Sequence, residues 1–272
     1  MKNEEVQICV MRVGGTNCDA ETKRAFEGLG VKAEVVHLNA LVNRKNLLSY
    51  DALVLPGGFS FGDYVRAGAI WAKGIATKLG QDLKRFVEQE KPVLGICNGF
   101  QVLVEAGLLP SFDGISRYPQ AVLATNEPAG YRCRWVHLKL ESRGSCIFTR
   151  KIPKTQVLMI PIAHAEGRFM FPKELEKKSL QRLVDNDQLV FRYCTEEGKH
   201  AEGEYPNNPN GAFSDIAGIC SPEGTIFGLM PHPERAYYGW QLPDWTRRDH
   251  VPEHGDGKLI LECMTDYLRK KF

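Results

Sequence analysis

The feature that most constrains the fold is an alternation of short β-rich runs and longer helical segments in the first part of the chain. The β-rich runs lie at 6–13, 31–38, 52–56 and 92–97. Such runs are typical of parallel strands that are buried on both faces. Apolar residues at helical spacing fill 69–90, and Asp19 is a candidate N-cap for a helix that ends at Gly30. The alternation predicts an open, mostly parallel α/β sheet flanked by helices, with right-handed crossovers.

The second half of the chain has a different sequence pattern. Short strand candidates lie at 134–141, 157–163, 188–193, 215–220 and 225–230. This pattern predicts antiparallel strands added to the parallel sheet. The stretch 204–211 is rich in Pro, Asn and Gly and is expected to be a loop, whereas 257–271 carries one apolar helical face. No repeat or linker separates the two halves, so we expect one continuous domain over 1–272.

The composition excludes several classes of protein. Lys and Arg number 35 against 33 Asp and Glu, which gives a net charge of +2 among 272 residues. The chain therefore offers no broad positive field for nucleic acid or an acidic membrane surface. No apolar run reaches the roughly 18–20 residues that a membrane span needs. Neither nucleic acid nor a membrane is expected as a partner.

The N-terminal stretch and the cysteines indicate the compartment. Residues 1–13 carry acids beside a short apolar run, without the basic leader of a secretory signal, so a cytoplasmic location is expected. The eight cysteines are scattered without any CxxC pair. Neither a zinc site nor a disulfide framework is indicated, and most cysteines are expected to be reduced and buried.

Cys97 is the first candidate catalytic residue. It lies where the apolar run 92–97 passes directly into a helical pattern, between Gly95 and Gly99. Small neighbours permit the sharp strand-to-helix turn that projects a nucleophile into a cleft. A helix N-terminus also favours the thiolate form of a cysteine. The alternative is a buried cysteine that merely ends a strand, because a nucleophile also needs a base.

A candidate base follows the apolar run that ends at Met230. The next residues are Pro231, His232, Pro233 and Glu234. A residue before proline is pushed towards extended geometry, and residues two apart in an extended chain lie on one side. Glu234 is therefore expected to reach the imidazole of His232 and fix its tautomer, leaving the other nitrogen for a nucleophile. The alternative is a surface turn with an incidental histidine.

A third predicted strand end joins these two. In open α/β sheets, ligands and catalytic groups gather at the carboxyl ends of strands. The run 52–56 ends in a Gly-Gly loop, whose glycines let backbone N–H groups approach a reacting centre. Gly58 and the amide of Asn98 are therefore predicted to form an oxyanion hole. The glycine pair alone also fits an ordinary tight turn.

Two further segments carry polar groups without a defined role. The segment 164–169 offers His164, Glu166 and Arg168 to a polar substrate or a partner protein, or forms a solvated loop. The segment 14–19, GGTNCD, precedes a helix as a phosphate-binding turn does, yet it lacks the Lys-Ser/Thr pair and the dinucleotide spacing. We assign no nucleotide to it.

Three motifs stand in order along the chain, namely PGGFSFGDY at 56–64, GICNGFQ at 95–101 and PHPER at 231–235. Together they resemble the class I, triad-type glutamine amidotransferases. The resemblance extends over nearly the whole chain through further segments at 14–19, 164–169, 208–220 and 256–264. Within the family, the motifs are most similar to the glutaminase subunits of phosphoribosylformylglycinamidine synthases, which act in purine biosynthesis.

The resemblance implies a flavodoxin-like sheet with a strand extension, and it implies a reaction. Cys97 would attack the side-chain amide of glutamine, forming a glutamyl thioester and releasing ammonia. Water would then release glutamate. His232 would act as the proton shuttle, and Glu234 would orient it.

The same resemblance implies the binding groups and the partners. Gly58 and Asn98 would supply oxyanion-hole amides, and Gln101 would help to hold glutamine. No cofactor or metal is implied for this subunit, because ATP and Mg²⁺ are used by a large synthetase subunit that receives the ammonia. A small third subunit usually bridges the two.

Other functions stay open at this point. The same triad could serve another acceptor, as in guanine nucleotide or anthranilate synthesis, and a non-catalytic regulatory module on the same fold is a further alternative. The charged segment 240–257 is expected to be a partner-docking surface or an ordered lid.

Overall fold

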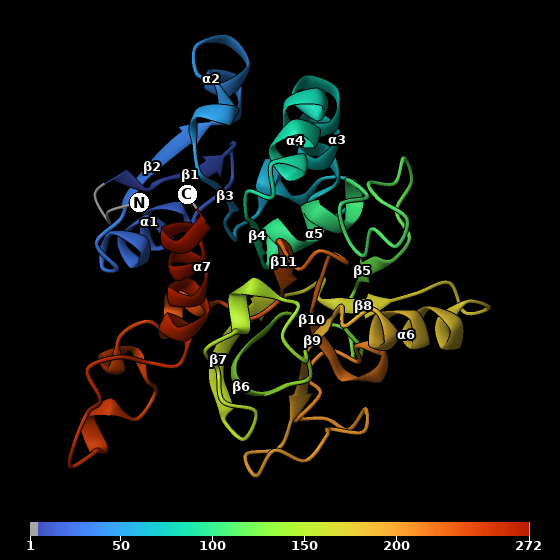
Figure 1. Cartoon of the computed structure of the whole chain (residues 1–272). Coiled ribbons are helices and arrows are strands. Elements are labelled where there is room, and N and C mark those ends of the chain that lie inside the picture. The colour runs from blue at the N-terminus through green and yellow to red at the C-terminus, as the bar shows by residue number, and fades with distance from the viewer. Residues whose placement is uncertain (1–4, 272) are drawn as a thin grey trace.

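A computed structural model describes residues 5–271, so the first four residues of the stretch considered as a leader lie outside the described residues. In the described chain, one large sheet has the strand order β2-β1-β3-β4-β11-β10-β9-β6-β7, and it runs through the whole molecule (Figure 1). A second, two-stranded sheet pairs β5 (Val122–Ala124) with β8 (Arg168–Met170). The first half of the large sheet is parallel and the second half is antiparallel.

The parallel half confirms the predicted α/β architecture. It consists of β1 (Gln7–Arg12), β2 (Lys32–His37), β3 (Ala52–Leu55), β4 (Val93–Ile96) and β11 (Ile226–Leu229), and each neighbouring pair is parallel. Every residue of β3, β4 and β11 is buried. Because successive side chains point to opposite faces of a strand, both faces of the sheet must be covered.

Helices provide that cover. The α-helices are α1 (Asp19–Glu27), α2 (Leu38–Asn43), α3 (Ala69–Lys78), α4 (Gly80–Glu88), α5 (Asn98–Glu105), α6 (Glu176–Asp185) and α7 (Gly257–Lys271). One group consists of α1, which packs on β1 and β2, and α7, which contacts α1. In a second group, α5 packs on β3, β4 and β11 and contacts α3. The helical face predicted over 257–271 is confirmed, with its apolar side buried.

The helical spacing over 69–90 is confirmed, but it belongs to two helices instead of one. The structure contains two helices there, α3 and α4, which are separated at Leu79 with φ −125° and ψ 7°. Gly80 follows the break, and glycine is a poor helix former because it loses the most backbone freedom on folding. The apolar residues keep their helical spacing across the break, so the sequence pattern does not reveal it.

The boundaries predicted for α1 also need correction. Cys18, not Asp19, occupies the N-cap position, and the helix ends at Glu27, before Gly30. Asp19 is the first helical residue and forms an ion pair with Arg12, at 3.2 Å. The positive end of the helix dipole stabilises a carboxylate in the first turn. Asp19 therefore suits the first helical position although it is not the N-cap residue.

The strand predicted at 225–230 is β11, and its prediction as an added antiparallel strand is wrong, because it pairs in parallel with β4 and is antiparallel only to β10. All its residues are buried, as is typical of a parallel strand covered on both faces.

The antiparallel half confirms the other four strands predicted after Pro110. It consists of β10 (Ile216–Cys220), β9 (Leu189–Cys194), β6 (Arg132–Leu140) and β7 (Val157–His164), and each neighbouring pair is antiparallel. The stretch 204–211 is a loop, as expected. The edge strand β7 returns to the parallel half, because the backbone N–H of His232 donates to the carbonyl of Pro161 at 2.8 Å.

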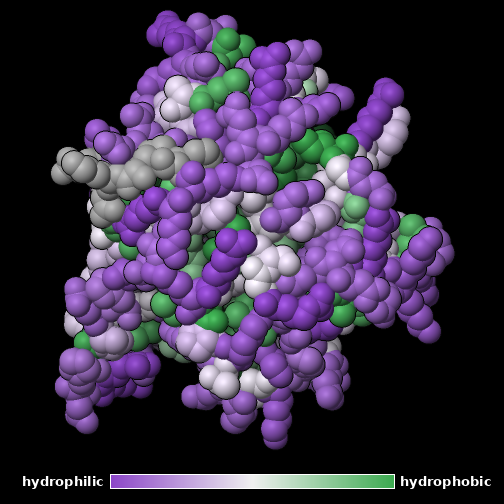
Figure 2. Space-filling view, viewed as in Figure 1, coloured by the Kyte–Doolittle hydropathy of each residue, from purple (hydrophilic) through white to green (hydrophobic). Residues whose placement is uncertain are grey.

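The two halves share one hydrophobic core, which includes residues of every strand in the large sheet. A single domain over 1–272 stays a prediction. The view in Figure 2 is mostly hydrophilic, with small separate apolar areas. No helix in the described part of the chain has both the length and the apolar character needed to cross a membrane.

The start of α5 approaches the end of β3 so closely that only glycine fits. A Cβ added to Gly99 would lie 1.8 Å from the carbonyl oxygen of Leu55, and one added to Gly95 would lie 2.6 Å from Cδ1 of Leu103. These distances are far below van der Waals contact. The expectation that small residues are needed on both sides of Cys97 is therefore confirmed.

We predict that Gly99→Ala lowers the free energy of unfolding by about 3 kcal/mol or more, because a methyl group would be forced against backbone. In an unobstructed helix the same change adds up to about 1 kcal/mol of stability. Gly80→Ala is the matched control, since nothing lies within 4 Å of the added Cβ. Urea denaturation of both variants tests the prediction, and a Gly99→Ala protein as stable as the wild type would contradict it.

Candidate active site

Cys97 lies at the elbow between β4 and α5 in a strained backbone conformation. Its φ is 50° and its ψ is −105°, and a positive φ in a residue with a side chain costs of order 1–3 kcal/mol. The backbone N–H of Cys97 donates to the carbonyl of Leu229 at the end of β11, at 2.8 Å. The adjacent strand therefore holds the elbow in place. The side chain is 4% exposed, so the thiol lies inside the protein.

His232 and Glu234 follow the end of β11, the strand next to β4. Nδ1 of His232 lies 2.6 Å from Oε1 of Glu234, and the two residues are only 2% and 1% exposed. His232 is extended, with φ −104° and ψ 91°, as expected for a residue before proline. Glu234, however, lies in a 3₁₀ turn over Pro233–Ala236. The predicted contact is confirmed, but the turn, not an extended chain, produces it.

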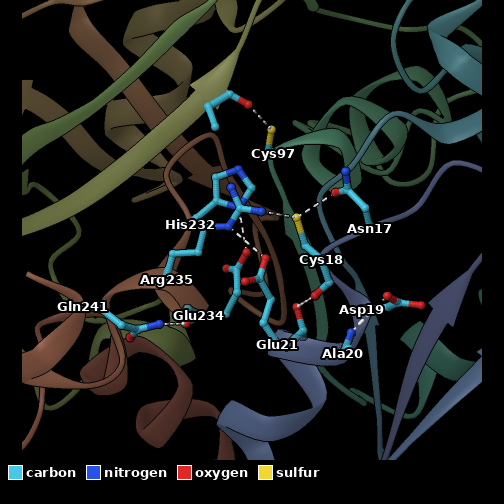
Figure 3. A network of polar contacts seen from close by, with 12 residues as sticks. Asn17, Cys18, Asp19, Ala20, Glu21, Cys97, His232, Glu234, Arg235 and Gln241 are labelled. Carbon is cyan, nitrogen blue, oxygen red and sulfur yellow. Dashed lines mark hydrogen bonds and ion pairs between the residues drawn. The ribbon is translucent and has the colours of Figure 1, made fainter.

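The imidazole of His232 lies near two thiols, those of Cys97 and Cys18 (Figure 3). Burial by itself lowers the pKa of His232. The Glu234 carboxylate and the two cysteines outweigh burial and raise the pKa of His232 well above its ordinary value. The imidazole is thus well suited to take up a proton in this pocket.

The segment 240–257 braces the turn that carries Glu234. The side chain of Gln241 donates to the backbone carbonyl of Glu234, at 3.2 Å, and accepts from two backbone N–H groups just before it. At the end of the segment, a Cβ on Gly257 would lie 2.1 Å from the carbonyl of Pro233. The segment therefore supports the active-site turn. The choice between a docking surface and a lid stays open.

The structure also brings Gly58, Asn98 and Gln101 to the elbow. Asn98 is the first residue of α5, so its backbone N–H has no acceptor within the helix. Its side chain accepts from the N–H of Ser60 at 3.3 Å and donates to Oε1 of Gln101 at 2.9 Å. Gly58 has φ 141° and follows β3, and its missing side chain leaves room for Asn17. These contacts lock the loop after β3 against the start of α5.

Two acidic groups lie in the same pocket: Asp63, which the sequence did not single out, and Glu166, which it offered as a contact for a polar substrate or a partner. Asp63 and Glu166 line a small cavity with Cys97 and Gln101. Burial and the nearby Glu166 raise the pKa of Asp63 to about 6. Glu166 accepts a hydrogen bond from the N–H of Ala67, at 3.0 Å. Both acids belong to motifs that the sequence showed, but their proximity depends on the fold.

The other polar residues of the segment 164–169 have structural contacts. His164 is buried, and burial together with His232 and Arg132 lowers its pKa to about 3, so this imidazole is neutral at physiological pH. Its Nδ1 lies 3.1 Å from Oδ1 of Asn126. Arg168 forms an ion pair with Glu127. Glu166 is therefore the charged residue of this segment that faces the elbow.

The GGTNCD segment forms a wall of the pocket, through Asn17 and Cys18. Thr16 pairs with Gly58, so the loop packs directly against the loop after β3. This packing places Cys18 beside His232, which the sequence did not predict. The thiol of Cys18 donates to Oδ1 of Asn17 and accepts from Arg235, each at 3.2 Å. Burial raises the pKa of Cys18 to about 11.

Comparisons with known proteins identify the family of the chain. A family model described as a CobB/CobQ-like glutamine amidotransferase domain matches residues 5–268. Phosphoribosylformylglycinamidine synthase subunit PurQ of Archaeoglobus fulgidus is 46% identical, over 99% of this chain and 100% of its own. PurQ of Methanococcus maripaludis is 43% identical, over 97% of this chain and 94% of its own. A solved structure of PurLQS from Thermotoga maritima is 31% identical with a TM-score of 0.70, over 97% of this chain and 99% of that one.

We predict that Glu234→Gln lowers the pKa of His232 by at least about one unit. The neutral amide no longer stabilises the imidazolium ion, whereas burial still opposes it, and a charge partner at this distance shifts a pKa by about 1–3 units. NMR titration of the imidazole tests this. Glu21→Gln is the control, since Glu21 pairs with Arg235 and not with the imidazole. An unchanged pKa in the Glu234 variant would contradict the prediction.

Proposed function

The chain belongs to the CobB/CobQ-like glutamine amidotransferase family and is the glutaminase subunit of phosphoribosylformylglycinamidine synthase, and we propose that Cys97, His232 and Glu234 carry out its chemistry. The observation that carries the proposal is the meeting of these three side chains at two adjacent strand ends. The fold brings them together across 135 residues of sequence, from 97 to 232. Such a meeting of nucleophile, base and orienting carboxylate is the general form of a catalytic triad.

The reaction follows from the groups present. His232 accepts the thiol proton as the sulfur of Cys97 attacks the side-chain carbonyl carbon of glutamine. The C–N bond then breaks, and the imidazolium returns the proton to the leaving ammonia, which leaves a glutamyl thioester on Cys97. Water attacks the thioester with His232 again as base, and glutamate leaves as the thiol is restored. Glu234 stabilises the imidazolium in both steps.

The developing oxyanion needs donors that are fixed before the reaction. The backbone N–H groups of Gly58 and Asn98 are suited to this role, because they belong to the two loops that meet at Cys97. Asn98 also stands at the N-terminus of α5, where the helix dipole favours negative charge. Such donors each contribute of order 3 kcal/mol to the transition state.

Asp63 and Glu166 would recognise the α-ammonium group of glutamine. They place negative charge in the cavity that Cys97 and Gln101 line. Gln101 is held in turn, because its side-chain N–H donates to the backbone carbonyl of Glu166. A carboxylate in this position forms an ion pair with the α-ammonium group of free glutamine. A glutamine residue within a peptide has no α-ammonium group, so it would not form this ion pair.

The pocket has to open before glutamine can enter. The cavity beside Cys97 is about 40 Å³, little more than the roughly 30 Å³ that one water occupies in the liquid. Asp63 is followed in the chain by Tyr64 and Val65, whose side chains are 75% and 85% exposed. Asp63 and Val65 also have positive φ, at 55° and 74°. We place the opening motion in this exposed, strained loop.

The family resemblance implies the partners. Ammonia passes to a large synthetase subunit that uses ATP and Mg²⁺, and a small third subunit bridges the two, so this chain needs no cofactor of its own. The similarity to the PurLQS structure supports association with other subunits. The PurQ relatives, which match over their full length, favour this acceptor over those of guanine nucleotide or anthranilate synthesis. The eight free cysteines suit a cytoplasmic, reducing compartment.

We predict that Cys97→Ala lowers glutamine-dependent activity of the reconstituted synthase by at least about 1000-fold, because no thioester can form. Activity with added ammonium salt should stay near the wild-type value, since the synthetase site is on the partner. Cys133→Ala is the matched control at an exposed cysteine, and it should keep both activities. Equal loss of the glutamine-dependent and ammonia-dependent activities in Cys97→Ala would contradict the assigned role.

We predict that Asp63→Asn lowers kcat/KM for glutamine at pH 8 by about 10–100-fold, the value of one charged hydrogen bond. Asp63 has a pKa of about 6, so the wild-type carboxyl becomes mostly neutral as the pH falls below 6. The ratio of wild-type to variant kcat/KM should therefore approach one as the pH falls from 8 to 5. Asp113→Asn, at an exposed carboxylate, is the control. A ratio that is constant over this range would contradict the prediction.

A further inference from the structure

Cys18 is a buried nucleophilic group for which the mechanism has no use. It lies beside the His232 imidazole, below Cys97 in Figure 3, and is 1% exposed. Its backbone N–H donates to the carbonyl of Gly57, at 3.2 Å, so the loop after β3 fixes its position. Backbone contacts thus hold this thiol beside the proposed catalytic histidine, where the two side chains could bind a ligand together.

The side chains around Cys18 form a set of metal ligands. The sulfur of Cys18, a ring nitrogen of His232 and a carboxylate oxygen of Glu234 all lie within 4.8 Å of one another, and all three residues are buried. Thiolate, imidazole and carboxylate are the three ligand types that zinc takes in proteins. Sites of three protein ligands leave a fourth position for water. The set therefore fits a thiophilic divalent cation and not Mg²⁺ or Ca²⁺, which prefer oxygen.

A second observation points to a ligand here. Nε2 of His232 and Oε2 of Glu234 have no hydrogen-bond partner among the described residues, although these residues are 2% and 1% exposed. Buried polar atoms are normally paired, and an unpaired one costs about 1–3 kcal/mol. The reaction uses one of the two atoms, since the imidazole must accept a proton from Cys97. The proposed glutaminase reaction gives no role to the other atom, Oε2 of Glu234.

A cavity adjoins two of the three ligands. A cavity of about 180 Å³ is lined by Cys18, His232, Asn17 and Arg235, with Tyr131 at its rim. This volume accommodates a hydrated ion and the water that would complete its coordination. Arg235 faces the sulfur as well, and Glu21 holds it through an ion pair of 2.8 Å. Thiolate and carboxylate together carry two negative charges, which exceed the single charge of Arg235.

We propose that Cys18, His232 and Glu234 bind a thiophilic divalent cation of the zinc type, and that this cation switches off glutamine hydrolysis. On binding, the Cys18 thiol releases its proton to solvent as the metal–sulfur bond forms. The metal uses the single basic lone pair of the neutral His232 imidazole. The imidazole therefore no longer accepts the proton of Cys97. The inhibition rests on the function proposed for His232, whereas the binding does not.

Cobalt(II) in place of zinc tests the binding directly on the full chain. The wild type should bind one equivalent and show the near-ultraviolet charge-transfer band of a thiolate–cobalt bond. Cys18→Ser keeps a hydroxyl for Asn17 and Arg235 but removes the sulfur. It should lose the band and weaken cobalt binding by at least about 100-fold, more than loss of an outer-shell partner costs. Cys97→Ala and Cys133→Ala should keep the band, because neither sulfur belongs to the set.

The outcomes separate the metal site from the proposed function. A band that survives in Cys18→Ser, a band lost in Cys97→Ala, or no saturable binding by the wild type would each overturn the metal site. If the site is real, zinc at the occupancy that cobalt reports should inhibit glutamine-dependent synthesis, and a chelator should restore it. Ammonia-dependent synthesis at the same zinc concentration is the control. Cobalt binding with undiminished glutamine hydrolysis would leave the metal site standing and refute the role given to His232.

Discussion

The close packing of α5 onto the end of β3 is the constraint on which the rest of the site depends. Gly99 lies against the backbone of Leu55 with no room for a side chain. The chain must therefore turn sharply after β4, and this turn forces Cys97 into its positive-φ conformation. The same packing brings the loop after β3, with Gly58, to the side of the sulfur. One backbone contact thus positions both the proposed nucleophile, Cys97, and the proposed oxyanion-hole donors beside it.

The antiparallel half of the sheet supplies the other side of the pocket. The edge strand β7 returns to the parallel half, where its Pro161 carbonyl accepts from the N–H of His232. The carbonyl of Ala163, two residues further along, lies 3.7 Å from the sulfur of Cys97. The groups that we propose as catalytic come from two distant parts of the sequence, and a strand from a third part holds them. Small shifts of β7 or of the segment 240–257 would move His232 and Glu234 together.

The sequence predicts what local chemistry determines. Apolar runs specify the buried parallel strands, and the glycines around Cys97 specify the elbow, because each acts over a few residues. The contact of Glu234 with His232 is also predictable, although a 3₁₀ turn and not an extended chain produces it. Cys18 and Asp63 are different. Their places depend on loops that pack against each other across the fold, and hydrophobic periodicity carries no information about such contacts.

The most direct test of the account is to locate the covalent adduct that a glutamine-derived diazo-ketone forms on the reconstituted synthase. Peptide mapping by mass spectrometry distinguishes the two thiols beside His232. The account predicts a single adduct on Cys97, formed much more slowly when His232 is replaced by alanine. An adduct on Cys18, or labelling of Cys97 at the same rate without His232, would contradict the claim that this imidazole activates this sulfur.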